Sequence, residues 1–221
     1  MLNLLLIVYI CLFVHLFSIA AAGRVAGVRV LEISIGVGPA LFKYKKFILK
    51  LIPINGYVKF LDSQEHFVSD ADLPFAFDQL SLMRKILVIL PGCTALLLLA
   101  ATLNGADAWQ DFCTFPTQFV TGALSPFDTA QTLLHAAGRL IQTSSFLSLL
   151  GIAAAKLAAG NLLPLVSTNG SQLIIFVAQR LGLVKPYPGP IHKFVAFVSI
   201  ACWISWTLAI VSVPVLAAYD L

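Results

Sequence analysis

The sequence predicts an α-helical polytopic membrane protein with about four transmembrane helices and a membrane re-entrant β-hairpin between the first and the second. Three observations support this class. Of the 221 residues, 59% are hydrophobic and 11% are charged, whereas soluble domains carry about 25% charged residues. Four apolar runs approach the length of about 20 residues that crosses a bilayer as a helix. An alternating, β-branched stretch separates the first two runs. We expect a single membrane domain over residues 1–221.

The first span is predicted at residues 2–22. A cleaved signal peptide is the alternative, because the stretch "SIAAAG" at residues 18–23 supplies small residues that a signal peptidase accepts. A signal peptide also begins with a basic segment, yet no Lys or Arg precedes Arg24. The membrane span is therefore the favoured interpretation.

Residues 27–60 are predicted to form the re-entrant β region. The stretch "VRVLEISIGVGP" alternates and ends in turn residues, and a second extended run, "FILKLIPINGYVKF", follows a basic turn. Such a sheet is tolerated at membrane depth only where protein or a water-filled cavity satisfies its backbone. A soluble hairpin is the alternative, but these residues are unusually apolar for one. The mixed, acidic segment 61–85 that follows is predicted to be a solvated cytoplasmic connector.

Three further spans are predicted at residues 86–103, 146–166 and 194–219. The outer loop 104–145 is too short to fold readily as an independent domain. Segment 171–184 is too short to cross the bilayer, so we expect a re-entrant or interfacial helix there. Pro164 and the following "STNGS" predict a break in the third span, and a simple proline kink is the alternative.

Basic residues are concentrated between the first two spans and between the last two. Because short loops rich in Lys and Arg remain cytoplasmic, both termini are predicted to be non-cytoplasmic. The chain is thus predicted to be a multi-pass integral membrane protein in contact with the lipid bilayer. No basic stripe with interleaved aromatics indicates a nucleic-acid partner, and the four cysteines predict no intramolecular disulfide.

Several short motifs follow one another along the chain. His15 precedes "GVRV" at residues 27–30, "SIGVGPALF" at 34–42, "LIPINGYVKFLD" at 51–62 and "NLLP" at 161–164. In this order the motifs resemble the site-2 protease family, the intramembrane zinc metalloproteases that include the bacterial anti-sigma-factor proteases. The resemblance extends over residues 2–184, without a PDZ-like module, and implies the bacterial inner (plasma) membrane as the location.

In active members of that family, two histidines of an HExxH helix and the aspartate of a late L-D-G turn hold zinc, and the glutamate is the general base. Here His15 keeps the first position, whereas Leu16, Ile19 and Asn169 stand at the other three. A catalytic zinc site takes three protein ligands, and a general base contributes roughly 10²–10⁴ in rate. The resemblance therefore predicts a pseudoprotease in which these four residues are vestigial, with no catalytic residue, no metal and no cofactor.

A polar network is predicted around this position from His15, Lys156, Asn161 and Asn169. Without metal partners, His15 should be neutral and should bond to Asn169 or Asn161. Lys156 lies near the middle of the third span, where a cation is costly. We expect its ammonium to face the interior and to bond to carbonyls of the sheet or to polar groups around the vacated site. Snorkelling to an interface is the alternative.

The resulting functional prediction is a catalytically inactive member that binds other membrane polypeptides, as a subunit of a hetero-complex or as a regulator. An extended peptide can add to an exposed sheet edge through main-chain hydrogen bonds, which need no metal. The predicted peptide-binding edge comprises Ile33, Ser34, Ile35, Gly36, Ile54, Asn55 and Gly56.

Two other functions are weighed against this prediction. An active intramembrane zinc metalloprotease with an unusual metal site would combine His15 with one of His66, His135 or His192. Those three histidines are expected in the connector, the outer loop and the last cytoplasmic loop, far from the middle of the first span. Small-molecule transport has little support, because Lys156 is the one charge in the predicted spans and no inverted repeat of broken helices is evident.

Overall fold

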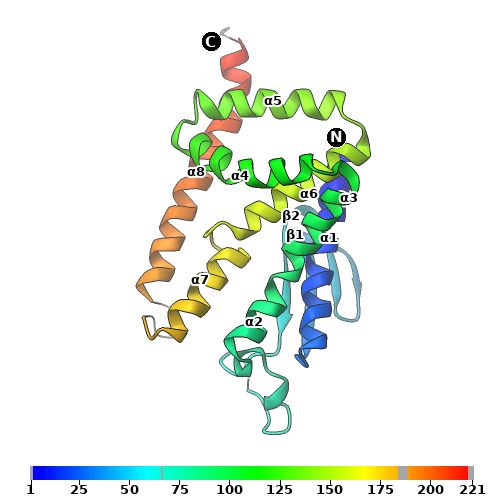
Figure 1. Ribbon diagram of the computed structural model, residues 1–221, viewed down its shortest axis with the longest axis vertical. Coiled ribbons are helices and arrows are strands. Elements are labelled where there is room, and N and C mark those ends of the chain that lie inside the picture. Colours follow the sequence, from blue (N-terminus) through cyan, green and yellow to red (C-terminus); the bar gives the residue numbers. More distant parts are fainter. Residues whose placement is uncertain (1, 66, 184–188, 219–221) are drawn as a thin grey trace.

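The computed structural model describes residues 2–65, 67–183 and 189–218. The longer elements in chain order are α1 (Leu2–Val25), β1 (Val30–Tyr44), β2 (Phe47–Phe60), α2 (Leu82–Ile89), α3 (Pro91–Asn104), α4 (Asp107–Leu124), α5 (Thr129–Thr143), α6 (Phe146–Leu162), α7 (Asn169–Arg180) and α8 (Pro190–Ala218). The predicted class, a helical membrane protein with a hairpin between its first two spans, is confirmed. We call the end that holds α4 and α5 the upper end, and the end that holds residues 61–81 the lower end (Figure 1).

Three helical stretches are long and apolar enough to cross a membrane: Leu2–Val25, Leu82–Asn104 and His192–Val213. The second joins α2 and α3, which meet at Pro91. The fourth predicted span, residues 146–166, is the shorter helix α6, with 17 residues. The helix ends before Pro164 because proline lacks an N–H and disfavours helical backbone in the residue before it. The predicted end of the interfacial helix at residue 184 and that of the last span at residue 219 lie outside the described residues.

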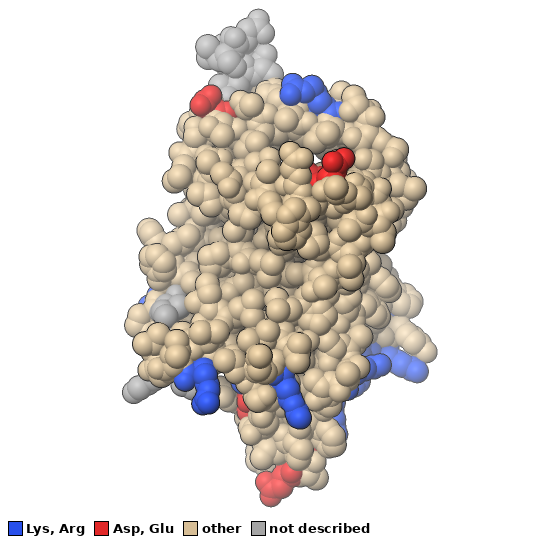
Figure 2. Space-filling view, viewed as in Figure 1, with Lys and Arg blue, Asp and Glu red and all other residues tan. Residues whose placement is uncertain are grey.

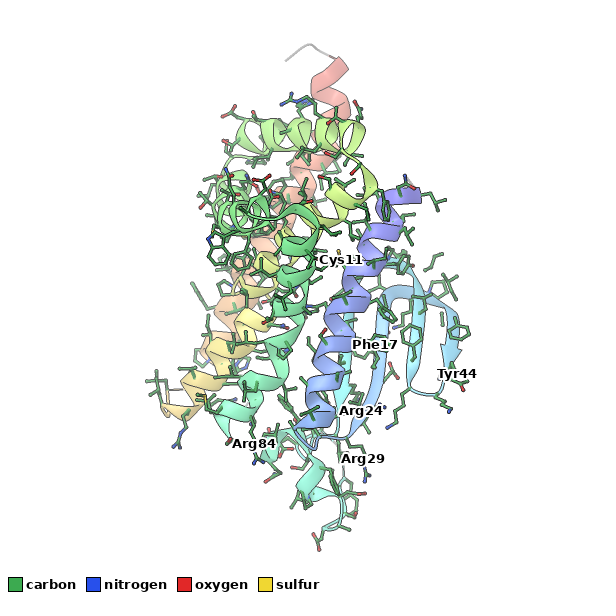
Figure 3. The ribbon with its side chains drawn as sticks, turned by 45° about the vertical axis from the view of Figure 1, so that its right-hand side comes forward. Cys11, Phe17, Arg24, Arg29, Tyr44 and Arg84 are labelled. Atoms are coloured by element: carbon green, nitrogen blue, oxygen red, sulfur yellow. The ribbon has the colours of Figure 1, made fainter. Side chains whose placement is uncertain are left out.

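Helix α1 packs on both of its sides. Ile7 and Cys11 are fully buried in a cluster with side chains of α3 and α6. The opposite side packs on the sheet, where the rings of Phe17 and Phe47 have centroids 5.7 Å apart. Figure 3 shows Cys11 and Phe17 on these two sides of the helix. The Tyr9 hydroxyl also donates to the Lys50 carbonyl at 2.7 Å, so the sheet lies alongside much of α1.

The two strands bend so that four segments lie side by side. Residues 33–35 pair with 56–58 on one side and with 47–49 on the other, and residues 37–44 pair with 47–52. The bend in β1 coincides with Gly36 and Gly38, whose φ angles of 90° and 89° fall in the left-handed region that favours glycine. Residues 37–44 and 56–60 therefore form the two outer segments of the sheet.

Residues 61–81 form a connector at the lower end with two short 3₁₀ turns, Leu73–Phe75 and Phe77–Gln79. Its carboxylates hold it together and tie it to the start of the sheet. Asp72 pairs with Arg29 at 2.6 Å, and Asp78 accepts hydrogen bonds from the backbone N–H and the hydroxyl of Ser63, at 2.9 and 2.6 Å.

The stretch predicted as an outer loop holds two helices, α4 and α5, that cross the upper end (Figure 1). Helix α4 packs against α8, where the Trp206 Nε1–H donates to the Phe119 carbonyl at 3.1 Å. In Figure 2, basic side chains form a band near the lower end of the visible face. In Figure 1, α6 and α7 lie between α8 on one side and α1 with the sheet on the other.

Candidate functional site

The candidate site is a cavity of about 1420 Å³ inside the helical assembly. Its walls come from α1, β2, α6, α7, the segment between α6 and α7, α8 and the connector, with aromatic rings of α4 near the upper end. Residues of the chain that are far apart in sequence meet here, including His15, Ile54, Lys156 and Asn169. The cavity therefore brings together the predicted vestigial site and part of the predicted peptide-binding edge.

His15, Leu16 and Ile19 line this cavity from α1. His15 is 5% exposed, and its Nδ1 has no hydrogen-bond partner among the described residues. The ring packs on α3 at Gly92: a Cβ there would lie 2.6 Å from the histidine Nδ1. The helices α1 and α3 approach so closely because residue 92 has no side chain.

Asn169 reaches the cavity because the helix is interrupted between α6 and α7. Thr168 caps α7, its hydroxyl accepting from the Ser171 N–H at 3.3 Å. The predicted break is thus present, in place of a simple kink. The Asn169 Nδ2–H₂ group donates to the Ile89 carbonyl at 2.8 Å and to the Cys93 sulfur at 3.4 Å. Asn169 therefore ties the start of α7 to the junction of α2 and α3.

Lys156 lines the cavity, and its partners are on α4. Its Nζ donates to the Gln118 Oε1 at 2.9 Å and lies 3.7 Å from the Asp111 Oδ1. The ammonium is also 5.9 Å from the centre of the Phe115 ring. These three residues lie on one face of α4, at spacings of four and three. Sequence reasoning missed them because it treated this stretch as a loop, although its amphipathic periodicity was visible.

The four residues of the predicted polar network all line the cavity, but no hydrogen bond joins them in the part of the chain that is described. Asn161 instead donates from Nδ2 to the carbonyl of Leu157, one turn earlier in its own helix, at 2.9 Å. His15 is not hydrogen-bonded to Asn169 or Asn161; the N–H₂ group of each amide donates to a backbone carbonyl instead.

The predicted peptide-binding edge is divided by the fold. Residues 33–35 are interior to the sheet, since they pair on both sides, and Gly36 lies at the bend. Ile54, Asn55 and Gly56 do line the cavity, together with residues 57–60 of the same strand. Within the described residues, 56–60 pair with β1 alone. The edge that faces the cavity is therefore the second half of β2.

Of the other histidines, His192 also lines the cavity, because it lies at the start of α8 and not in a distant loop. Its Nδ1 accepts a hydrogen bond from the Gly189 N–H at 3.2 Å. His135 lies on α5 at the upper end, and His66 is outside the described residues.

A family comparison matches residues 3–206 to Peptidase family M50. A "Putative zinc metalloprotease" of Neisseria meningitidis is 38% identical over 95 residues, which are 41% of this chain and 21% of that protein. A protein of the same name from Xylella fastidiosa is 36% identical over 94 residues, 40% of this chain and 21% of its own. The "Regulator of sigma E protease" of Haemophilus influenzae is 33% identical over 84 residues, 36% and 19% of the two chains. The chain spans about a fifth of the length of these relatives.

These findings contradict two predictions drawn from the substituted motifs. The protein was expected not to be an enzyme and to have no metal among its partners. The matched family is a peptidase family, and the names of two of these relatives specify zinc. Family and relatives thus point to a zinc metalloprotease.

The residues at the motif positions do not by themselves fit a zinc ion. Leu16 and Ile19 carry no donor atom, and Asn169 directs its Nδ2 to a carbonyl and a sulfur. The described residues hold no group of three or more His, Cys, Asp or Glu side chains placed to bind a metal. A catalytic zinc takes three protein ligands. No reaction step through zinc follows from these side chains.

Proposed function

The chain belongs to peptidase family M50, the site-2 protease family, and we propose that it binds an extended segment of another membrane polypeptide in the cavity beside β2. One observation carries the proposal. Residues 56–60, one of the two outer segments that pair on one side only within the described residues, form a wall of the cavity. An edge strand offers unpaired N–H and C=O groups to a second chain.

The environment of this edge favours a polypeptide over a small molecule. The cavity volume of about 1420 Å³ exceeds the range of roughly 300–1,000 Å³ that is usual for small-molecule sites. The edge runs beside α1, a candidate membrane span, since a Cβ at Gly56 would overlap a methyl carbon of Leu16. At membrane depth an extended peptide must have its backbone groups satisfied by protein. Pairing with the edge satisfies the backbone groups on one side of the peptide, for a stable partner subunit or for a client alike.

Site-specific photocrosslinking tests the proposal with a defined probe. The full chain is reconstituted in vesicles with a biotinylated single-span peptide that carries a Gly-Pro pair at its centre, which weakens its helix. A photoreactive residue replaces Ile54 at the cavity edge. In the matched control it replaces Leu41 at the opposite outer segment. Both side chains are exposed, by 71% and 58%.

We expect strong crosslinking of the peptide from position 54 and weak crosslinking from position 41. A proline placed at Tyr57, which removes one backbone N–H from the segment 56–60, should reduce the yield from position 54. Equal yields from the two positions would contradict binding at the cavity edge.

Zinc-dependent peptide-bond hydrolysis is a second candidate, and the names of the relatives favour it. It shares the binding step with the first proposal. Metal analysis of the purified chain and cleavage of the same probe, with and without a chelator, separate the two. Bound zinc and chelator-sensitive cleavage that disappear in His15→Ala would support hydrolysis. If the protein contains no zinc and the probe is crosslinked but never cleaved, the result would support binding without hydrolysis.

A further inference from the structure

Lys156 places a positive charge on the wall of the cavity. It is the eleventh residue of α6, so it lies about 15 Å along the helix from Phe146. The side chain is 26% exposed, the same fraction as that of Asp111, its nearest carboxylate. A cation at membrane depth is costly and is expected to have a functional partner.

The contacts within the protein satisfy this ammonium only in part. An ammonium group has three N–H donors. Among the described residues, Gln118 accepts one hydrogen bond, while the Asp111 oxygen at 3.7 Å lies beyond hydrogen-bond distance. Since Lys156 lines the cavity, a molecule bound there can reach the remaining donors.

We propose that Lys156 makes the cavity selective for membrane polypeptides that carry a hydrogen-bond-accepting side chain, best a carboxylate, within their membrane-embedded segment. This inference rests on the proposed function. Charge-assisted hydrogen bonds are roughly twice as strong as neutral ones, and the low dielectric of the interior strengthens them further. The same cavity holds the sheet edge, which only a polypeptide can use through its main chain.

Asp111 limits this preference, because it is the competing negative charge. A carboxylate that hydrogen-bonds to Lys156 approaches Asp111 as well, and the two repel each other. Removing the charge in Asp111→Asn should therefore increase the preference for a carboxylate. Removing the ammonium in Lys156→Gln should abolish it.

The test measures binding of fluorescent single-span peptides to the full chain in phosphatidylcholine nanodiscs. The peptides are identical except for Leu, Gln, Glu or Lys at one central position. We expect the Glu peptide to bind about tenfold more tightly than the Leu peptide, with Gln between them and Lys weakest. Moving Glu along the span should give a maximum at one depth.

Three variants complete the test. Lys156→Gln should bring the Glu and Leu peptides to similar affinity, whereas Lys43→Gln, the same change at an exposed position near the end of β1, should leave the preference intact. Asp111→Asn should enlarge it. Equal binding of Glu and Leu peptides to the natural chain would overturn this inference but not the proposed function. Failure of every peptide to bind would overturn both, and Lys156-dependent binding of oleate alone would assign the site to a lipid carboxylate instead.

Discussion

At the scale of single residues, close backbone approach decides the geometry of the site. Glycines stand where elements meet around the cavity. A Cβ at Gly92 would lie 2.6 Å from the His15 Nδ1, and one at Gly56 would lie 2.4 Å from a methyl carbon of Leu16. One at Gly170 would lie 2.1 Å from the Leu162 carbonyl oxygen. The positions of the cavity side chains on α1 thus depend on neighbours that have no side chain.

The replacement Gly92→Ala should destabilise the protein, because the new methyl group forces α1 and α3 apart at His15. We expect a cost of about 1–3 kcal/mol, typical of overpacking, measured as a lower thermal midpoint in detergent. Gly138→Ala in α5 is the matched control, since nothing lies within 4 Å of its Cβ position. That change should be neutral or slightly stabilising, by up to about 1 kcal/mol. An unchanged midpoint in Gly92→Ala would contradict this account of the helix contact.

Asn169 and Asn161 offer a second matched pair at this scale. Asn169→Ala removes the hydrogen bond that links α7 to the buried carbonyl of Ile89, and an unsatisfied buried group costs about 1–3 kcal/mol. Asn161→Ala removes a bond within one helix and should cost less. The two thermal midpoints check the order. A larger loss in Asn161→Ala would show that the long-range contact is not the stabilising one.

At the scale of elements, the break between α6 and α7 and the helix α4 shape the cavity. The break turns Asn169 toward α2 and α3, and α4 provides Phe115 and Phe119 at the cavity wall. Helix α4 accepts hydrogen bonds from Lys156 and Trp206, and its Ala108 and Phe112 pack in the hydrophobic core. The connector at the lower end is held by a few polar contacts. Those of Asp78 depend on pH, because its carboxyl group titrates.

Partial burial raises the pKa of Asp78, but the hydrogen bonds from the hydroxyl and backbone of Ser63 and from Gln79 together outweigh it, so the pKa lies below its ordinary value. A carboxylate with a lowered folded-state pKa stabilises the fold above its unfolded pKa of about 3.9. That stabilisation is lost as the pH falls through the folded pKa. Protection of residues 61–81 from hydrogen exchange should therefore decline at acidic pH.

Asp78→Asn should reduce this protection at neutral pH and remove the part of the acid decline that Asp78 causes. Asp70→Asn, a change on the exposed surface of the same connector, is the control and should behave like the natural chain. Hydrogen exchange followed by mass spectrometry measures both. If Asp78→Asn retained the full acid decline, another group would be responsible for it.

At the scale of the whole molecule, charge is distributed unevenly between the two ends. Helix α1 begins and α8 ends at the upper end (Figure 1), and the basic band lies near the lower end (Figure 2). Arg24, Arg29 and Arg84 belong to that lower region (Figure 3). Because basic segments remain cytoplasmic, the lower end should face the cytoplasm.

Cysteine labelling in intact cells checks this orientation. Cys113 on α4 is exposed, whereas Cys11 and Cys93 are buried. In a chain that retains only Cys113, a membrane-impermeant maleimide should react from outside. In a chain with Ser69→Cys in the connector as the one cysteine, the reagent should react only after permeabilisation. The reverse pattern would invert the orientation.

The sequence by itself determined the membrane class, the hairpin and the family, because hydrophobic run length, β-branched alternation and ordered motifs are local signals. It also predicted the interruption of the helix around Pro164. Local signals carry less information about partners. The sequence does not distinguish residues 33–36 from residues 54–56 as an edge of the sheet. Whether a strand segment pairs on one side or on both depends on how the strands bend.

Tertiary structure alone decided which side chains share the cavity. The contact of Lys156 with Asp111 and Gln118 joins positions about 40 residues apart. His192 and His15 line the same cavity although they lie near opposite ends of the chain. Such neighbours are chosen by helix packing over the whole molecule, where small residues such as Gly92 permit close approach. The periodicity of a single segment does not encode these contacts, so the side chains that meet in the cavity can be identified only from the tertiary structure.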